Sequence, residues 1–337
     1  MYHPRLKGSH YEMGTRYGSV LYKNGFRFPE IPNHKIEFGM EGLEDLTHFY
    51  PEIVEEMKAF AKAVHTPFEN VAGLLLSMGV FDMEGQCSIF AFRNGENVIF
   101  GRNYDFLFSH RNYCESALIC PENKKAFLAQ GDVFIGKMDG VNQSGLAIGM
   151  NFVNGQEKKP GISFSLLVRY VLEHCSTTDE AIKILLDTPI CSTNNYLIAD
   201  KSGNIAAVEV TPSHRWVRKP IEGQNYIYTT NQFLSKEMKT FDLGGNEWSK
   251  SRERTAGLDK LLKNKRILSL EMAKAILSNR SCHLCMELKS AQFGTLYSFI
   301  SQLNDLEIQR AERKPTPNNY KEDLRLRNYL FKKKLLD

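Results

Sequence analysis

Residues 85–92, Gly-Gln-Cys-Ser-Ile-Phe-Ala-Phe, and residues 97–106, Asn-Val-Ile-Phe-Gly-Arg-Asn-Tyr-Asp-Phe, are two apolar runs separated by a short polar segment. That segment contains Asn94-Gly95, the dipeptide that most readily adopts the positive φ angles of a type I′ turn between twisted strands. The two runs therefore predict a β-hairpin with strands over 87–93 and 97–106. Its first strand begins at a cysteine.

The register of this hairpin determines which side chains lie across from the cysteine. A two-residue loop at the Asn-Gly dipeptide pairs Arg93 with Glu96, and counting back along the strands pairs Cys87 with Arg102. Asp105 follows three residues further along the second strand. This register predicts a thiol that faces a guanidinium, with a carboxylate nearby.

A thiol becomes a good nucleophile when it is deprotonated, and a neighbouring cation such as Arg102 lowers its pKa from about 8.5. A base is also needed, but no histidine lies near Cys87 in the sequence, and a papain-like cysteine would begin a helix instead of a strand. A nucleophile at a strand start can use its own α-amine, which titrates near about 8, if the chain is cut immediately before it. The sequence therefore predicts self-cleavage between Gln86 and Cys87.

The composition excludes several classes of protein. The chain has 337 residues, 42% of them hydrophobic and 24% charged, which is typical of folded globular proteins. A net charge of +4 without a basic stripe makes nucleic acid an unexpected partner. No signal-peptide core and no run of about 18 apolar residues is present, so we expect a cytoplasmic chain without a membrane span. Seven scattered cysteines indicate reduced thiols.

Outside the hairpin, hydrophobic periodicity predicts alternating blocks of helices and strands. Helices are expected over 51–63, 163–173, 179–186 with Thr178 as the N-cap, 271–277 and 321–334, and the stretch 303–313 is also expected to be helical. Strands are expected over 116–119, 126–130, 145–152, 195–200, 205–210, 226–231 and 294–300. This order indicates helices outside stacked antiparallel sheets, in a single domain that spans 1–337.

Several short runs form a pattern together with Cys87-Ser88. They are 101–106 (Gly-Arg-Asn-Tyr-Asp-Phe), 145–152 ending in Met-Asn-Phe, 194–200 (Asn-Asn-Tyr-Leu-Ile-Ala-Asp) with Glu209, Thr230-Asn231, 251–254 (Ser-Arg-Glu-Arg) and 295–298 (Thr-Leu-Tyr-Ser). Over most of its length the chain thus resembles the N-terminal nucleophile hydrolases, specifically the choloylglycine hydrolase and penicillin V acylase group. Within that group it is most similar to the acyl-CoA:6-aminopenicillanic acid acyltransferase-like branch.

The resemblance implies an α+β fold, namely a four-layer αββα sandwich, and an inactive precursor. An intramolecular N-to-S acyl shift would cut this precursor into a light fragment, 1–86, that stays bound to a heavy fragment, 87–337. Gln86 departs from the family pattern, in which a glycine often precedes the cysteine. The long segment before Cys87 favours the acyltransferase-like branch, because bile-salt hydrolases begin at or near the cysteine.

The resemblance also implies roles for individual site residues. Asp105 would hold the α-amine and orient the thiol, and Arg102 would supply positive charge beside it. The side-chain amides of Asn151 and Asn231 would lie near the scissile carbonyl, and one or both would donate to the oxyanion, a contribution of about 3 kcal/mol per donor in comparable sites. Arg254 would complete the cluster, with Arg252 as the alternative by register.

Three functions remain open at this point. The first is hydrolysis of a linear N-acyl amide through a Cys87 thioester, and the second is transfer of the acyl group, from acyl-CoA or another amide, to an amine. The third is an unprocessed, non-catalytic relative that binds an acylated ligand. No cofactor is expected, and no glycine-rich phosphate loop marks a CoA site.

Ordinary structural alternatives exist for each motif. Arg102 and Asp105 could form a common ion pair, and the two asparagines could satisfy backbone groups at strand ends. Cys282-His283-Leu284-Cys285 has the spacing of half a zinc site or a redox pair, but no second pair exists, so no metal is expected. By the resemblance to the family's loops around the nucleophile, the apolar and aromatic residues of 25–39 and 134–142 are expected to form walls of the substrate pocket.

Overall fold

The structure is a computed structural model that describes residues 1–81, 85–245, 247–263 and 269–335. Its α-helices are α1 (His10–Lys23), α2 (Asn33–Glu41), α3 (Leu43–Phe49), α4 (Pro51–Ala63), α5 (Phe68–Leu76), α6 (Phe164–His174), α7 (Thr178–Asp187), α8 (Ser251–Lys263), α9 (Leu270–Leu277) and α10 (Arg325–Lys334). Its strands are β1 (Arg5–Gly8), β2 (Gln86–Asn94), β3 (Asn97–Leu107), β4 (Glu115–Pro121), β5 (Phe127–Gly131), β6 (Asp139–Asn142), β7 (Leu146–Phe152), β8 (Asn194–Asp200), β9 (Ile205–Val210), β10 (Arg215–Arg218), β11 (Tyr226–Thr229), β12 (Glu287–Leu288), β13 (Phe293–Gln302), β14 (Glu307–Ala311) and β15 (Lys321–Glu322).

The strands form two sheets. In one sheet the strand order is β1-β4-β5-β6-β7-β8-β9-β10, and in the other it is β11-β2-β3-β13-β14-β15, with β12 beside β13. Neighbouring strands are antiparallel except for β1, which runs parallel to β4. Side chains from both sheets share one apolar core, in which Ile89 and Ala91 of β2 belong to the same cluster as Val141 and Leu197 of the facing sheet.

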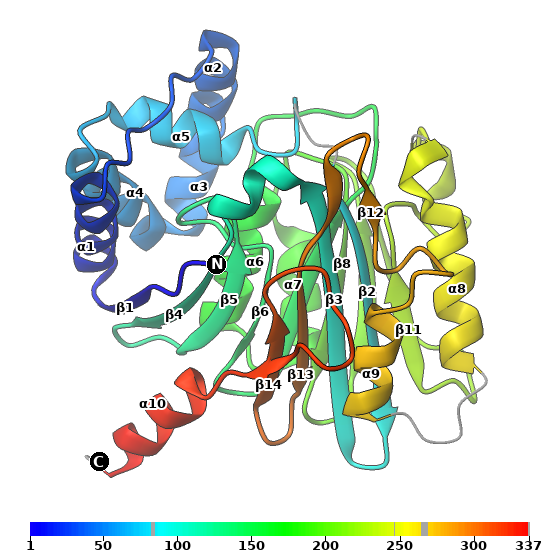
Figure 1. Cartoon of the computed structure of the whole chain (residues 1–337). Coiled ribbons are helices and arrows are strands. Elements are labelled where there is room, and N and C mark those ends of the chain that lie inside the picture. Colours follow the sequence, from blue (N-terminus) through cyan, green and yellow to red (C-terminus); the bar gives the residue numbers. More distant parts are fainter. Residues whose placement is uncertain (82–84, 246, 264–268, 336–337) are drawn as a thin grey trace.

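Helices cover the outer faces of this pair of sheets. The core that includes Leu166 and Leu185 of α6 and α7 also contains Ile148 of β7, whereas Phe90 of β2 packs in a separate core with Leu258 of α8. Figure 1 shows α8 and α9 along one flank and the N-terminal helices α1–α5 on the opposite side. The four layers confirm the predicted αββα sandwich, which follows from strands whose alternate side chains are apolar on both faces.

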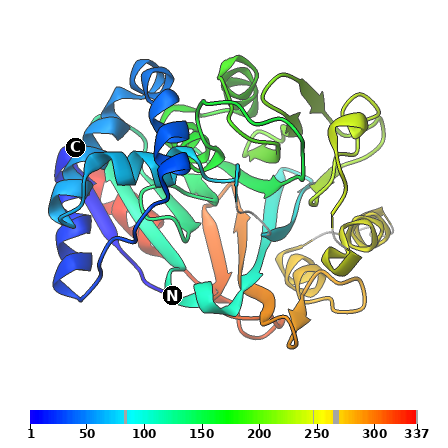
Figure 2. The same ribbon diagram turned by 90° about the horizontal axis from the view of Figure 1, so that it is seen from above.

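The N-terminal helices pack into the same core as one of the sheets. Met57 and Phe60 of α4 are fully buried in a cluster that also contains Ile119 of β4. In the view from above, the blue N-terminal helices gather at one end of the molecule (Figure 2). The segment before Cys87 therefore contributes to the packed core of the protein.

The turn of the central hairpin lies one residue later than predicted. Asn94 and Asn97 are the last pair of β2 and β3, so the loop residues are Gly95 and Glu96. Gly95 has φ +59, and no positive φ occurs at Glu96. Glycine in the left-handed region at the first loop position alone is the requirement of a type II′ turn, which competes with type I′ at such dipeptides.

The predicted cross-strand pair was wrong by two residues for the same reason. Cys87 lies opposite Tyr104, and Arg102 lies opposite Ile89. Side chains alternate between the two faces of a sheet with a period of two, so an even shift leaves every side chain on its predicted face. Arg102 therefore remains on the same face as the thiol.

Three other sequence-based expectations differ from the structure. The stretch 303–313, expected to be helical, contains strand β14, because pairing with β13 outweighs a weak helical preference. The N-cap of α7 is Thr177, whose side chain accepts from the backbone N–H of Glu180, and Thr178 is the first helical residue. Strand β11 ends at Thr229, two residues earlier than expected.

A buried charge cluster joins the N-terminal segment to α6. The two terminal nitrogens of Arg169 donate to the two carboxylate oxygens of Glu56 at 2.8 and 2.5 Å, and its Nε donates to Glu173 at 2.9 Å. All three side chains are buried. Because Glu56 lies on α4, the cluster binds α4 to α6 across the layer.

We expect Arg169→Met to lower the free energy of unfolding by about 3–5 kcal/mol, because two buried carboxylates lose their cation. Lys58→Met is the matched control: its partner Glu55 is exposed, so the loss should stay below about 1 kcal/mol. Urea-induced unfolding measures both. Equal losses in the two variants would contradict a special contribution from the buried cluster.

Among the residues described above, no helix is long and apolar enough to cross a membrane.

Candidate active site

The Cys87 thiol lies near the start of β2, between the two sheets. Only 2% of the residue is exposed. Nη2 of Arg102 donates to Sγ at 3.1 Å. Burial nevertheless raises the pKa of the thiol to about 11, and this outweighs the opposite effect of the Arg102 charge. The expected low thiol pKa is thus not found, and in the intact chain the thiol is protonated at neutral pH.

Arg102 is held in place by groups that sequence reasoning missed. Its Nη1 donates to the carboxylate of Asp139 and, at 2.9 Å, to the hydroxyl of Tyr297, which itself donates to Asp139 at 3.0 Å. Nη2 also donates to the carbonyl of Met150 at 3.1 Å. The ion pair of this guanidinium is therefore with Asp139 on β6 and not with Asp105.

The backbone of Cys87 is bound on both sides by predicted site residues. Its amide N–H donates to Oδ1 of Asn231 at 2.9 Å. Its carbonyl accepts from Nδ2 of Asn151 at 2.9 Å and from Nη1 of Arg254 at 2.6 Å. Asn151 lies on β7, Asn231 lies in the segment that follows β11, and Arg254 lies on α8. Cys87 is thus the centre of contacts from three separate parts of the chain.

The two asparagine amides differ from the predicted arrangement around the scissile carbonyl. Nδ2 of Asn231 donates to the carbonyl of Gly85 at 3.1 Å and to that of Phe152 at 2.8 Å. Asn151 donates to the carbonyl of Cys87 and accepts from the Thr229 hydroxyl at 2.6 Å. In the intact chain the amides therefore bind the carbonyls of residues 85 and 87, on either side of residue 86.

Asp105 lies on the other face of the hairpin from the thiol, because it pairs with Gln86. Its Oδ1 accepts from the hydroxyl of Thr295 at 2.5 Å. Its Oδ2 is buried and has no hydrogen-bond partner among the residues that the structure describes. Burial raises the pKa of Asp105 to about 6, against the lowering effect of Arg254 and Arg102. Oδ2 of Asp105, on the residue that pairs with Gln86, therefore has no hydrogen-bond partner in the described ranges.

Helix α8 decides between the two candidate arginines. Arg254 is fully buried, and its Nη2 donates to Oε1 of Gln86 at 2.8 Å and to Oδ1 of Asn231 at 3.0 Å. Arg252 lies on an exposed part of the same helix. The structure therefore brings Arg254, and not Arg252, together with Cys87. Gln86 contacts the cluster through its own side chain.

Removing the Asp105 charge should stabilise the uncleaved chain at neutral pH. A carboxyl pKa raised from 3.8 to about 6 means that the folded chain binds this proton more tightly than the unfolded chain does. Stability contributed by this group therefore increases as the pH falls through about 6, and the ionised form costs up to about 3 kcal/mol above that pH.

We expect Asp105→Asn, made in a Cys87→Ala background, to unfold at higher urea than Cys87→Ala alone at pH 7, because the amide has no charge to bury. The difference should shrink as the pH falls below about 6 and disappear near the unfolded-state pKa of 3.8, where both states of the chain bind the proton. Urea titrations of the two proteins across this range measure it. A difference that does not change with pH would contradict the raised pKa.

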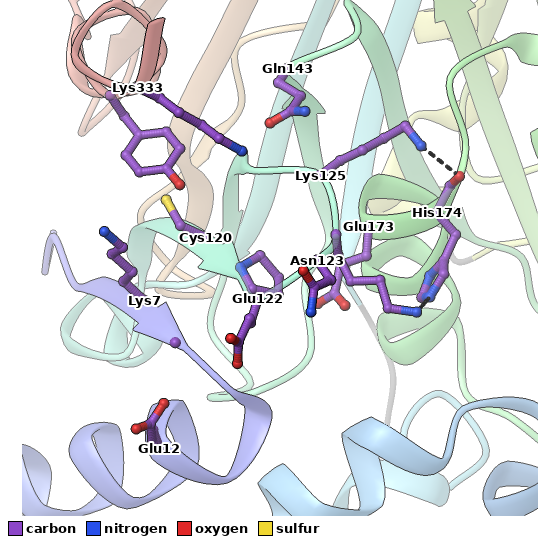
Figure 3. A pocket seen from close by; sticks show the side chains of 14 residues that line it. Lys7, Glu12, Cys120, Glu122, Asn123, Lys125, Gln143, Glu173, His174 and Lys333 are labelled. Atoms are coloured by element: carbon purple, nitrogen blue, oxygen red, sulfur yellow. Dashed lines mark hydrogen bonds between the residues drawn. The ribbon is translucent and has the colours of Figure 1, made fainter. Parts of the chain in front are cut away.

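A cavity of about 780 Å³ lies between α10, the end of β4 and the end of α6 (Figure 3). Cys120, Lys7 and Lys333 line it, and Lys125 donates to the carbonyl of His174 at 2.9 Å. None of the predicted site residues lines this cavity. It is therefore separate from the site around Cys87.

The C-x-x-C motif does not extend into a metal cluster within the described ranges. Cys282 and Cys285 are both free thiols, and Cys285 is buried with its Sγ near the carbonyl of Pro315. No group of three or more histidine, cysteine, aspartate or glutamate side chains with metal-binding geometry occurs there.

Comparisons with solved structures find this fold in known enzymes at low sequence identity. A variant of the conjugated bile acid hydrolase from Clostridium perfringens superposes with a TM-score of 0.51 at 17% identity, over 70% of this chain and 92% of the other. The N-acylethanolamine-hydrolyzing acid amidase ortholog of Caenorhabditis elegans gives 0.50 at 16% identity, over 65% and 93%. Penicillin V acylase from Agrobacterium tumefaciens gives 0.47 at 16% identity, over 67% and 83%.

Sequence comparison identifies the family more directly. No curated protein shows a significant match to the chain. Residues 92–317, well over half of the sequence, match the family model of acyl-coenzyme A:6-aminopenicillanic acid acyl-transferase. The predicted resemblance is thereby confirmed at the level of family and fold. The chain belongs to the acyl-coenzyme A:6-aminopenicillanic acid acyl-transferase family.

Proposed function

We propose that the protein is a self-processing cysteine amidohydrolase that cleaves a linear N-acyl amide through a thioester on Cys87. The observation that carries this proposal is the set of contacts on one residue: Arg102 binds the thiol, Asn231 the amide N–H, and Asn151 and Arg254 the carbonyl. A structural cysteine has no need of charged and amide side chains as partners for its thiol, its N–H and its carbonyl. The whole set is buried, where each interaction is strengthened.

Self-cleavage is the first step of the proposed mechanism. Sγ of Cys87 attacks the carbonyl carbon of Gln86, the bond from that carbon to the Cys87 nitrogen breaks, and the thiol proton passes to the nitrogen. Water then hydrolyses the thioester and releases residue 86 as a carboxylate. The products are the fragments 1–86 and 87–337, with a free α-amine on Cys87.

Cleavage supplies what the intact site lacks. A thiol whose pKa burial raises to about 11 requires a base to attack at neutral pH, and the new α-amine would be that base. Asp105 pairs with Gln86 across the hairpin, and its Oδ2, which has no hydrogen-bond partner among the described residues, would accept from that amine. Departure of Gly85 would also free Nδ2 of Asn231 as an oxyanion donor.

In turnover the thiolate attacks the amide carbonyl of a small-molecule substrate, the amine leaves with the α-amine proton, and water hydrolyses the resulting thioester. The bile acid hydrolase and the N-acylethanolamine-hydrolyzing acid amidase, which share this fold, are by name hydrolytic enzymes. Family membership supports a second candidate, acyl transfer from acyl-CoA or an amide to an amine, because the family is named for an acyl-transferase.

Partitioning of the thioester tests the choice between the two functions. N-acyl amides are supplied with and without an acceptor amine, and free acid and new amide are quantified. Hydrolysis predicts free acid as the main product in both cases. New amide as the main product when the acceptor is present would overturn hydrolysis in favour of transfer.

A further inference from the structure

Strand β13 has one extra residue where it pairs with β3. Thr295 pairs with Asp105 and Tyr297 with Tyr104, which leaves Leu296 without a partner on β3. Such a β-bulge changes which face of the sheet a side chain occupies, and bulges are common next to active sites. In a regular strand the side chains of residues 295 and 297 would lie on the same face. With the bulge, the two side chains contact site residues on opposite faces.

Tyr297 lies on the same face as the thiol. Its hydroxyl accepts from Nη1 of Arg102 at 2.9 Å and donates to Asp139 at 3.0 Å. Its ring packs beside that of Tyr104, with centroids 5.2 Å apart, and Tyr104 is the cross-strand partner of Cys87. Tyr297 therefore helps to fix the guanidinium that binds the thiol.

Thr295 lies on the other face, beside Asp105. Its hydroxyl donates to Oδ1 of Asp105 at 2.5 Å and accepts from the backbone N–H of Met286 at 2.9 Å. The N–H of Thr295 also donates to the carbonyl of Met286 at 3.0 Å. Because a hydroxyl has a single proton and the N–H of Met286 can only donate, that proton is directed to the carboxylate. Only 1% of Thr295 is exposed.

This contact fixes one oxygen of the Asp105 carboxylate and leaves the other one open. Oδ2 is buried and has no hydrogen-bond partner among the described residues, and Asp105 pairs with Gln86 across the hairpin. A carboxylate whose Oδ1 is bound cannot turn about its Cβ–Cγ bond without breaking that hydrogen bond. The orientation of Oδ2 therefore depends on Thr295.

On the basis of the proposed function, we propose that Thr295 is a positioning residue, which orients Asp105 so that Oδ2 accepts from the α-amine that cleavage exposes on Cys87. A backbone nitrogen belongs to neither face of a sheet, so a carboxylate on the face opposite to the thiol can bind it. The bulge makes this arrangement compatible with the contact between Tyr297 and Arg102. One strand thus supports the base from one face and the thiol from the other.

Conservative variants test this role on cleaved protein. Thr295→Val has nearly the same shape but no hydroxyl, and kcat for an N-acyl amide should fall at least about 10-fold per cleaved chain, as expected for a lost hydrogen bond to a charged group. KM should change little, because Thr295 binds Asp105 and not the substrate. Thr295→Ser keeps the hydroxyl and should restore most of kcat. Thr188→Val is the control: it removes another buried hydroxyl, one that binds a helix carbonyl, and should leave kcat unchanged.

Three results would overturn the positioning role. The first is a Thr295→Val enzyme with the kcat of the wild type. The second is a Thr295→Ser enzyme as slow as Thr295→Val, because the loss would then come from packing. The third is an equal loss in Thr188→Val, because any buried hydroxyl would then have the same effect.

A titration of Asp105 detects the same contact without turnover. Burial raises the pKa of Asp105 to about 6, against the lowering effects of Arg254 on α8, the Thr295 hydroxyl and Arg102 on β3. Burial and the Asp105 charge raise the pKa of the nearby Cys285 thiol, between α9 and β12, to about 11, so this thiol stays protonated at neutral pH. Loss of the Thr295 hydroxyl should therefore raise the pKa of Asp105 further.

Urea unfolding of Cys87→Ala protein across the pH range measures this pKa, as the difference from the matching Asp105→Asn protein. Adding Thr295→Val should move the pKa up by at least about one unit, a tenfold change in proton affinity, and adding Thr295→Ser should leave it in place. If no amide is hydrolysed but this shift is found, Thr295 orients the carboxylate and the hydrolase proposal alone fails. If no shift is found, the positioning role is refuted whatever the activity.

Discussion

Cys87→Ala protein is expected to remain a single polypeptide of 337 residues, whereas the wild-type chain yields fragments of 86 and 251 residues, the second being 337 less 86. The reason is that the predicted acyl shift requires Sγ, which the alanine lacks. Turnover should fall by at least about 10³-fold, since both the nucleophile and the α-amine base are lost. Intact mass under denaturing conditions and an amidase assay measure the two effects.

Cys191→Ala is the matched control. Cys191 is as deeply buried as Cys87, and its substitution also removes one thiol sulfur, but from a place outside the site. This variant should be cleaved and active like the wild type. A persistent single chain in active wild-type preparations would refute the self-cleavage mechanism, and a single chain without activity would favour the non-catalytic, ligand-binding alternative.

Asn231→Ala should lower turnover by about 10²–10³-fold, the loss associated with one oxyanion donor, and should also slow self-cleavage, because the backbone on both sides of Gln86 loses its contacts with this side chain. The side chain of Asn231 binds the amide of Cys87 through Oδ1 and the carbonyl of Gly85 through Nδ2. Its loss also removes a partner of Arg254. The rate of fragment appearance and kcat for an amide substrate measure the two effects separately.

Two further variants sharpen this prediction. Asn231→Asp retains an acceptor for the Cys87 amide but has no Nδ2 donor, so turnover should remain as low as in Asn231→Ala. Asn142→Ala removes another buried asparagine, one that binds the carbonyls of Leu172 and Cys175, and should affect stability without a comparable loss of rate. Near-normal turnover in Asn231→Asp would exclude Nδ2 as an oxyanion donor.

The sequence predicted the central hairpin well because its signals are local. Alternating apolar residues define both strands, and glycine at the turn limits the loop to two residues. The turn type was not predictable, because types I′ and II′ accept similar dipeptides, and the pairing of Cys87 was therefore wrong. The predicted contact between Arg102 and the thiol was nevertheless correct, since a shift by two residues kept Arg102 on the same face of the sheet as Cys87.

The charge environment of the site was much less predictable. The partner of Arg102 is Asp139, which lies on another sheet and has no distinctive sequence neighbourhood. The assignment of Arg254 over Arg252 depends on which face of α8 is buried. The thiol pKa depends on burial, which opposes the neighbouring arginine and outweighs it. Each of these features arises from contacts between elements far apart in the sequence.

The sequence by itself determined the strand that begins at Cys87, the layered αββα fold and the family, because periodicity and turn chemistry act over a few residues. Only the tertiary structure decided how the thiol is held. Asn151, Asn231 and Arg254 come from separate elements and all bind the backbone of Cys87. Asp139, from the facing sheet, pairs with the Arg102 that binds the thiol. The same packing buries the thiol, which raises its pKa, and buries one oxygen of Asp105 that has no hydrogen-bond partner in the part of the chain that the structure describes.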